Sequence, residues 1–417
     1  MKTDHSLPLW ALIDQAGISA TRFLIAVMVG KYGSEAELGL YSAGFGILVA
    51  MITVQESLVT TPYTFFSSQL DQLKRNTFAG SALTTVLAYL GSVTVLMAGV
   101  LAGLWILEVR GDFLAILMAL VLITPTALLR EFCRRWLFAH LRIRMATLLD
   151  ILFSAVTLIG MVILIVLDQT TAFFALLITG LSSLVVVLLA FQFRDEFKFQ
   201  KSEVRRDISK KFSFGKWAAG ASLLSAVLMY FAHWFLMATQ GEAAAGLYAA
   251  CLTLVLLANP FLLGLSSILA PLAARAVAEQ GRPALLRLVC RYLFKVVGIL
   301  LVFAGALAFS GDWLLGVVFD PSYQGNQYTI NILAIALIGI GVNFILANGL
   351  YALGQPRHDL FAAAIGLGVT GFLAWITQPE NPGQMANCFA SGVLIMAVYR
   401  IVVFFVLASR PEPTHET

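Results

Sequence analysis

The sequence predicts an all-α polytopic membrane protein with about 12 transmembrane helices in two six-helix repeats. Three observations support this fold class. Hydrophobic residues make up 59% of the 417-residue chain and charged residues only 12%, with a mean hydropathy of +0.87, whereas about a quarter of the residues in a soluble domain are charged. Apolar runs long enough to cross a bilayer recur along the whole chain, and the chain matches itself at about half its length.

The apolar runs reach or approach the ~18 residues that a membrane-spanning helix requires. They are much longer than the ~10-residue alternating strands of a membrane barrel, and a helix satisfies its own backbone hydrogen bonds in lipid. We therefore expect each run to be a helix. The expected spans are 7–30, 38–67, 77–105, 113–138, 144–167, 170–192, 213–238, 243–273, 288–310, 328–352, 358–378 and 384–408.

The first span is predicted to remain in the mature chain. Asp14 and Arg22 interrupt it, so it lacks the short unbroken apolar region and small-residue cleavage site of a secretory signal. The four cysteines occur singly, without a CxxC motif or nearby histidines at metal-ligand spacing. They are interpreted as apolar packing residues, and no metal site, cofactor or disulfide framework is expected.

The basic residues are distributed very unequally between the two sides of the predicted topology. With a cytoplasmic N-terminus, the external loops contain only Lys31 and Arg110, Arg22 lies within a span, and the other 24 of the 27 Lys and Arg fall on the cytoplasmic side. The positive-inside rule then places both termini in the cytoplasm. The basic segment Arg194–Lys216 is either a solvated connector or a segment attracted to anionic lipid headgroups.

An internal repeat relates the two halves of the chain. A shift of 207 positions aligns Gly39-Leu40-Tyr41 with Gly246-Leu247-Tyr248, and a shift of 213 aligns Leu137-Phe138-Ala139 with Leu350-Tyr351-Ala352. Because six is an even number of spans, both halves enter the membrane from the same side. The expected domains are an N-terminal lobe at 1–193, a basic cytoplasmic linker at 194–212 and a C-terminal lobe at 213–417.

The second span carries a narrow polar stripe. At about 100° per residue, its four members fall within about 60° of one another on the helix surface. The stripe either lines a water-filled cavity, where Pro62 would help to bend the helix, or projects into the cytoplasm. Its residues are Glu56, Thr60, Tyr63 and Ser67.

The first span places Arg22 and Gln15 on one face, two turns apart, with Asp14 on a neighbouring face. A deep arginine suits a diphosphate, which it can bind through bidentate, charge-assisted hydrogen bonds. The alternatives are an ion pair with Glu56 or extension to the outer headgroups. Asp14 is a candidate for ion coupling, because a short carboxylate inside a helix cannot easily reach the headgroups.

The seventh span, the counterpart of the first, also has a polar face, formed by Ser222, His233 and Gln240. His233 is either a packing histidine or a group that senses protons or binds sugar. Two clusters of basic residues occur at the ends of other spans: Arg130 with Arg134, and Arg287 and Arg291 with Lys295. They are interpreted mainly as topology signals, with anionic lipid binding as the alternative.

Three sequence motifs suggest a family. The segments GLYSA (Gly39–Ala43), GLYAA (Gly246–Ala250) and YALGQPR (Tyr351–Arg357) resemble those of the polysaccharide/oligosaccharide flippase family. This family belongs to the multidrug/oligosaccharidyl-lipid/polysaccharide exporter superfamily. The resemblance covers essentially the whole chain and implies a V-shaped pair of lobes whose central cavity alternates between the two membrane faces.

The resemblance also implies a function. The cargo would be a lipid-linked oligosaccharide, a sugar chain on polyprenyl pyrophosphate, flipped in the bacterial inner membrane for lipopolysaccharide or exopolysaccharide biosynthesis. The polar helix faces described above would line the cavity, with Gln15, Arg22, Glu56, Thr60, Tyr63, Ser222, His233 and Gln240. The two basic clusters would have, as their alternative role, the gathering of polyprenyl pyrophosphate from the inner leaflet. Partners would be membrane lipids, Na⁺ or H⁺ and the polysaccharide polymerase machinery, with no nucleic acid.

Two other functions compete with this one. The first is an ion-coupled exporter of cationic drugs or metabolites, in which Asp14 and Glu56 would bind cations or protons. The second is a membrane polysaccharide polymerase or ligase. That enzyme needs a substantial external catalytic loop, and the longest external loop expected here, 310–327, contains only Asp312 and Asp320 as acids. We therefore expect a transporter and not an enzyme.

The charge distribution makes the topology testable with introduced cysteines in a background without native ones. Cysteines at Gly33, Gln324 and Asn381 should react with an impermeant thiol reagent added outside intact cells, whereas a cysteine at Ser202 should not. Labelling at Ser202 alone would reverse the assignment of the two faces.

Overall fold

The computed structural model describes residues 7–67, 70–108, 111–199 and 201–409, with the backbone only for 7–9, 11–12, 72–73, 201–216 and 267. Every regular element within these ranges is a helix, which confirms the predicted fold class. The chain divides into two compact units, Met1–Ala219 and Gly220–Thr417. This division falls inside a helix. The linker predicted at 194–212 stays a prediction, and its residues from Lys201 onward are helical in the structure.

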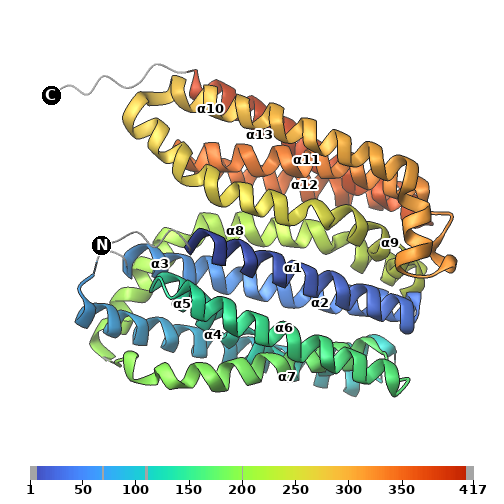
Figure 1. The fold of residues 1–417 in the computed structure, drawn as a ribbon, viewed down its shortest axis with the longest axis horizontal. Helices are drawn as coiled ribbons and strands as arrows, with labels where there is room; N and C mark the ends of the chain where they lie inside the picture. Colours follow the sequence, from blue (N-terminus) through green and yellow to red (C-terminus); the bar gives the residue numbers. More distant parts are fainter. Residues whose placement is uncertain (1–6, 68–69, 109–110, 200, 410–417) are drawn as a thin grey trace. The chain divides into compact units, whose positions relative to one another are not determined.

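The N-terminal unit contains seven complete α-helices, a short π-helix, a 3₁₀ turn and the beginning of α8 among its described residues (Figure 1). Its elements are α1 (Leu7–Tyr32), α2 (Glu35–Gln55), η1 (Glu56–Thr60), α3 (Thr61–Ser67), α4 (Gln72–Ile106), α5 (Asp112–Ala139), α6 (Ile143–Val166), α7 (Ala172–Ala190) and η2 (Phe191–Glu196).

The C-terminal unit follows from α8, which begins in the basic segment and continues into this unit. Its elements are α8 (Lys201–Gln240), α9 (Glu242–Val255), η3 (Leu256–Ala258), α10 (Asn259–Val318), η4 (Pro321–Tyr323), α11 (Gln327–Ala352), α12 (Pro356–Thr377) and α13 (Pro382–Ala408).

Eleven helical stretches in the described ranges are long and apolar enough to cross a membrane. One of them, Glu242–Val318, is 77 residues long and contains two of the predicted spans. It folds back on itself within α10 (Figure 1), where Gly281 has non-helical dihedral angles of φ 74° and ψ −173°. The first arm of α10 together with α9 and η3, and the second arm by itself, therefore account for two of the twelve expected spans.

Side-chain caps fix the beginnings of several helices. Ser34 caps α2 by accepting a hydrogen bond from the Glu37 N–H at 3.1 Å, and Asp71 caps α4 in the same way from Lys74 at 3.0 Å. Such side chains satisfy N–H groups that the first turn of a helix leaves without partners. Polar residues between the apolar runs thus determine where the neighbouring helices start.

The repeat seen in the sequence is also present in the backbone. α5 ends at Ala139 and α11 ends at Ala352, 213 positions later, and α6 and α12 begin with the same separation. Each connecting turn has one residue in the left-handed region, Leu141 and Gly354. In both turns an N–H then closes a 2.9 Å hydrogen bond to the carbonyl five residues earlier, as in a Schellman helix end.

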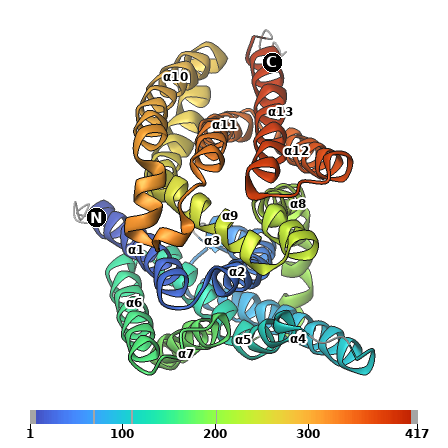
Figure 2. The ribbon, with the colours of Figure 1, turned by 90° about the vertical axis from the view of Figure 1, so that its right-hand side faces the viewer.

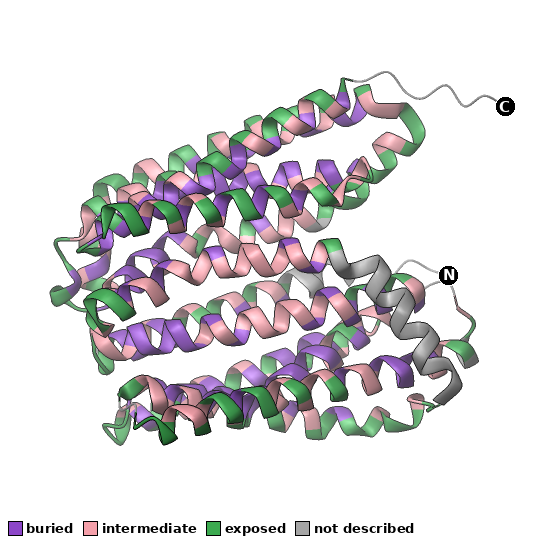
Figure 3. Cartoon of the chain, turned by 180° about the vertical axis from the view of Figure 1, so that it is seen from behind, coloured by how far each residue is buried: buried purple, intermediate pink, exposed green. Residues whose placement is uncertain are grey.

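Within each unit, the helices pack in the same general manner. In the N-terminal unit α1 packs against α6, and α2 and α7 pack against α5; in the C-terminal unit α11 packs against α10 and α13 (Figure 2). α12 approaches α13 so closely that a Cβ at Gly392 would overlap the Thr370 hydroxyl, the kind of contact that small residues permit between membrane helices. Buried and exposed residues alternate along single helices (Figure 3).

Some of the basic residues that predict the topology lie outside the part of the chain that the structure describes. Lys2 and Arg110 lie outside the described residues, as do the side chains of the basic segment between 201 and 216. The placement of the termini in the cytoplasm stays a prediction.

The turn in α10 should depend on the glycine at its centre. Gly281→Ala should lower the free energy of unfolding by about 1–3 kcal/mol, because φ 74° with ψ −173° is a conformation that essentially only glycine adopts without strain. Gly298→Ala, in the same helix with open space around its Cβ, is the matched control and should be neutral or slightly stabilising. Thermal unfolding in detergent measures both; equal melting temperatures would contradict the prediction.

Candidate functional site

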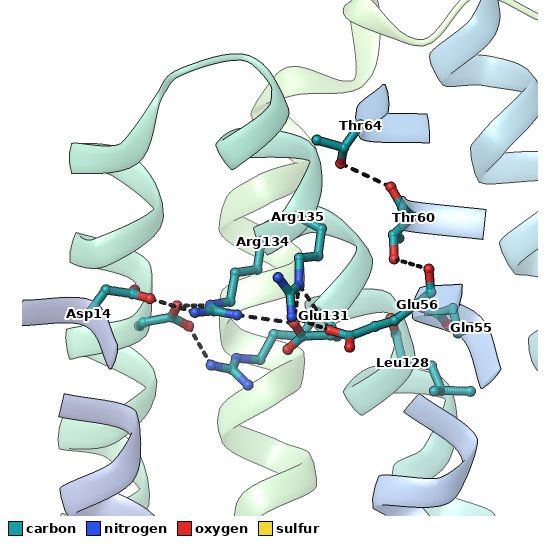
Figure 4. A network of polar contacts seen from close by, with 11 residues as sticks. Asp14, Gln55, Glu56, Thr60, Thr64, Leu128, Glu131, Arg134 and Arg135 are labelled. Atoms are coloured by element: carbon teal, nitrogen blue, oxygen red, sulfur yellow. Dashed lines mark hydrogen bonds and ion pairs between the residues drawn. The ribbon is translucent and has the colours of Figure 1, made fainter. Parts of the chain in front are cut away.

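A network of charged side chains joins four elements of the N-terminal unit (Figure 4). Four carboxylates and three guanidinium groups take part, and six of the seven residues are buried or half-buried, whereas Arg135 is exposed. Charges in a membrane-spanning segment are costly unless they are paired or solvated, so their clustering indicates a function or a structural requirement. The members are Asp14 of α1, Glu56 of η1, Arg130, Glu131, Arg134 and Arg135 of α5, and Asp150 of α6.

Arg134 lies at the centre of this network. Its guanidinium donates to Oδ2 of Asp14 at 2.5 Å, to Oδ2 of Asp150 at 2.6 Å and to Oε1 of Glu131 at 3.1 Å. Its side chain is 12% exposed. One buried cation therefore holds carboxylates from three different helices together.

Arg130 shares the Asp150 carboxylate, donating to its Oδ1. The guanidinium carbon of Arg130 also lies 3.7 Å from the centre of the Phe153 ring, within the range of a cation–π contact. Asp150 thus bridges two arginines that are one turn apart on α5. This bridging offsets the repulsion between the two like charges.

Arg135 forms the other end of the network, toward η1. It donates to Oε1 of Glu56 at 2.5 Å and to Oε1 of Glu131 at 3.1 Å, and its side chain is 45% exposed. The neighbouring Gln55 is fully buried and donates to the Leu128 carbonyl at 2.9 Å (Figure 4). Two successive residues of the second span therefore both contact α5.

The π-helix η1 explains how the second span continues past Pro62. Pro62 has no N–H and its ring would clash with the carbonyl of residue 58 in a regular helix. In η1 the N–H of Thr61 bonds instead to the carbonyl of Glu56, five residues earlier. Single π-turns of this kind are frequent at functional sites, and this one contains Glu56 of the network.

The predicted site residues of α1 occupy three different environments. Asp14 is buried in the network, Gln15 is half-buried, and Arg22 is exposed, with its guanidinium carbon 5.6 Å from the centre of the Phe45 ring. The ion pair between Arg22 and Glu56, one of the alternatives from the sequence, is not formed, because Glu56 pairs with Arg135. No ion pair of Arg22 is found within the described part of the chain.

Most of the predicted polar stripe on the second span faces the interior of the N-terminal unit. Tyr63 is 0% exposed and its ring stacks on Phe78 and His140, while Thr60 and Ser67 are also buried. Burial lowers the pKa of the His140 imidazole, which favours its neutral form. Only Glu56 of the stripe has appreciable exposure, and cargo binding by Thr60 and Tyr63 stays a prediction.

The predicted polar face of the seventh span does not form one site. His233 is buried and packs edge-on against Tyr248, with 5.1 Å between ring centres. Gln240 is exposed at the end of α8 and donates to the Pro379 carbonyl at 3.3 Å. Ser222 lines a cavity that includes neither of the other two residues.

That cavity, of about 320 Å³, lies within the C-terminal unit among α8, α11, α12 and α13. Most of its wall is apolar, with Met229, Phe344 and Phe389 among the lining residues. A second buried ion pair reaches it: Arg400 donates to Asp359 and, at 2.8 Å, to Oδ1 of Asn343. Nε of Arg400 is buried without a partner among the described residues.

Several residues of the network and of the Arg400–Asp359 ion pair were not predicted as site residues from the sequence. Arg130 and Arg134 were interpreted as topology signals, and Glu131, Arg135, Asp150, Asp359 and Arg400 received no site role. The sequence could have marked them as candidate site residues, since each is an ionisable residue within or beside an apolar span. The partners on other helices could not be identified, because they are 16 to 120 positions away in the chain. No group of three or more potential metal ligands was found in the described ranges.

Comparison with solved structures gives the fold a context. A multidrug resistance MATE family transporter of the MOP superfamily, in an inward-facing conformation, has 14% sequence identity and a TM-score of 0.75, covering 97% of this chain and 94% of that one. An outward-facing structure described in the same words has 14% identity, a TM-score of 0.67 and coverage of 97% and 96%. The chain has the fold of these transporters.

A third similar structure is a MOP superfamily transporter from Pyrococcus furiosus, described as having a binding pocket of reverse polarity that suggests a different function. It has 14% identity and a TM-score of 0.70, with 97% of this chain and 94% of that chain covered. No family model and no curated protein matched the sequence. At these identities the similarity shows the fold, and the flippase resemblance remains a prediction.

The network should make Arg134 essential for stability and Arg22 dispensable for it. Arg134→Met should lower the free energy of unfolding by about 3–5 kcal/mol, because it leaves buried carboxylates without their shared cation. Adding Asp14→Asn should recover part of this loss. Arg22→Gln, the exposed control on α1, should change stability by less than about 0.5 kcal/mol.

A double-mutant cycle on unfolding in detergent measures these differences. Additive effects of Arg134→Met and Asp14→Asn would contradict the ion pair. A large loss in Arg22→Gln would show that Arg22 has a structural partner.

Proposed function

We propose that the chain is an alternating-access transporter that flips a lipid-linked oligosaccharide, a sugar chain on polyprenyl pyrophosphate, across the bacterial inner membrane for surface polysaccharide biosynthesis. The fold of solved transporters with inward- and outward-facing conformations supports the transport mechanism. The sequence motifs support the cargo. Both termini would lie in the cytoplasm.

The pairing of the deeply placed carboxylates, together with an exposed arginine, is the observation that favours an anionic cargo. The deeply placed carboxylates of Asp14, Glu131 and Asp150 each contact an arginine. Glu56 and Asp359 do so as well. Arg22, by contrast, is exposed. A cationic cargo would need a carboxylate that is both accessible and unpaired, whereas a diphosphate needs an accessible guanidinium.

Two guanidinium groups are therefore the proposed ligands of the cargo in the N-terminal unit. Arg22 is exposed on α1, and Arg135 on α5 is half-exposed while it pairs with Glu56. Arginine can bind a phosphoryl group through two parallel hydrogen bonds, which fixes both its position and its orientation. The half-buried amide of Gln15 and the partly exposed Glu56 are proposed to contact sugar hydroxyls.

Asp14 is the proposed coupling residue. Its Oδ2 is held by Arg134, whereas its Oδ1 is buried and has no hydrogen-bond partner among the described residues. A proton or a sodium ion bound there would supply that partner and weaken the bond to Arg134.

Asp14→Asn should therefore reduce transport and flatten its dependence on pH or on sodium concentration. Transport by purified protein in vesicles, measured across a series of pH values and sodium concentrations, tests this role. An unchanged dependence in a folded variant would make Asp14 purely structural.

An ion-coupled exporter of drugs or metabolites is the second candidate function. The apolar cavity of about 320 Å³ in the C-terminal unit has the size and lining of a small-molecule site, and two of the similar structures are described as multidrug transporters. A polysaccharide polymerase or ligase is less well supported, because the similar structures are transporters. We propose no enzymatic activity.

Deletion of the gene separates these functions. Loss of surface polysaccharide, with lipid-linked repeat units accumulating on the cytoplasmic leaflet, is the expected result. Complementation with Arg22→Gln should fail although the protein is folded, because an amide cannot replace a charged bidentate donor. Complementation with Lys31→Gln, an exposed residue at the end of α1, should succeed. Normal polysaccharide with increased drug susceptibility would favour the second candidate.

A further inference from the structure

A cavity lined by three arginines lies beside the turn of α10. It has a volume of about 380 Å³ and lies between the two arms of the helix, which meet at Gly281. Arg275 lies on the first arm, six residues before the turn, and Arg287 lies on the second arm, six residues after it. Arg291 lies one helical turn beyond Arg287. The turn therefore brings together cations that the chain separates by up to 16 positions.

The charges in this cavity are not balanced by the protein. Nε of Arg275 lies 3.2 Å from Oε1 of Glu279, which is the only acidic residue in the lining. Neither Arg287 nor Arg291 makes an ion pair within the described ranges, and both are exposed. Like charges one turn apart on a helix repel each other. An anion between them would convert this repulsion into attraction.

The position of the turn points to a lipid as the source of the anion. Both arms of α10 belong to a stretch that is long and apolar enough to cross the membrane, so the turn between them lies near one membrane surface, at the depth of the headgroups. Leu272 lines the cavity, and Phe294, on the second arm, is 84% exposed. A phosphate headgroup in the cavity would leave its hydrocarbon chain beside these apolar side chains.

We propose that this cavity binds the diphosphate headgroup of a polyprenyl lipid. A diphosphate has two adjacent phosphoryl groups, which allows it to contact Arg287 and Arg291 together, whereas the single phosphodiester of a common phospholipid carries one negative charge. Three guanidinium groups with one carboxylate give the cavity a formal net charge of +2, which suits the more highly charged headgroup. The identity of this lipid as the cargo rests on the proposed function.

Binding of farnesyl pyrophosphate, a short polyprenyl diphosphate, to the full-length chain in neutral-lipid nanodiscs tests the proposal. All variants are compared in an Arg22→Gln background, so that the accessible guanidinium of the proposed cargo site does not contribute. The double substitution Arg287→Gln and Arg291→Gln should weaken binding at least about tenfold, since it removes two charge-assisted contacts. Lys295→Gln is the matched control, because Lys295 is an exposed cation on the same arm that does not line the cavity. It should change the affinity less than about twofold. Melting temperatures check that each variant is folded.

Competition by phosphatidylglycerol and direct binding of inorganic pyrophosphate distinguish the possible ligands. Added phosphatidylglycerol should compete weakly, and inorganic pyrophosphate alone should bind more weakly than farnesyl pyrophosphate, because it lacks the chain. Equal affinity with and without the double substitution would overturn the proposal, as would equal loss in Lys295→Gln or full competition by phosphatidylglycerol. The binding assay tests the cavity, and the gene deletion tests the proposed function. Each result can be negative while the other is positive, because binding is measured without export.

Discussion

The buried guanidinium of Arg134 is the interaction on which the N-terminal unit depends. Removing charges from water costs several kcal/mol per ion unless partners replace the lost hydration. Arg134 receives three such partners, from Asp14, Glu131 and Asp150, and thereby fixes the positions of α1 and α6 relative to α5. Apolar packing alone would allow these helices to slide along one another, because packing is only weakly directional. The ion pairs define a single register.

The two repeats use corresponding positions in opposite ways. With the shift of 213 that aligns α5 with α11, Arg130, Glu131 and Arg134 correspond to Asn343, Phe344 and Ala347. In the N-terminal unit these positions carry paired charges that fill the interior. In the C-terminal unit the same three positions line the cavity of about 320 Å³. The duplication thus preserved the backbone, including the turn after each helix, while the side chains diverged. These positions consequently hold paired charges in one unit and line a mostly apolar cavity in the other.

Much of the fold follows directly from local sequence. Apolar length, together with the requirement that a span satisfy its own hydrogen bonds, determines helices and their approximate limits, and polar caps such as Ser34 and Asp71 mark where helices begin. The repeat was visible because a few glycines and aromatic residues kept their spacing. The return of α10 at Gly281 was expected only as a gap between two spans. The π-turn before Pro62 was expected as a bend, and its five-residue hydrogen bond was not.

By itself, the sequence determined that the chain crosses the membrane many times, that it is built from two related halves, and that ionisable residues lie within its spans. Each of these properties depends on composition, on length or on spacing along the chain. Only the tertiary structure decided which charges meet. Glu56 pairs with Arg135 and not with Arg22, and Tyr63 is enclosed by aromatic rings although its helical position predicted a polar face. Helical periodicity gives the direction of a side chain around its own axis, whereas its partner depends on which helix packs against that face.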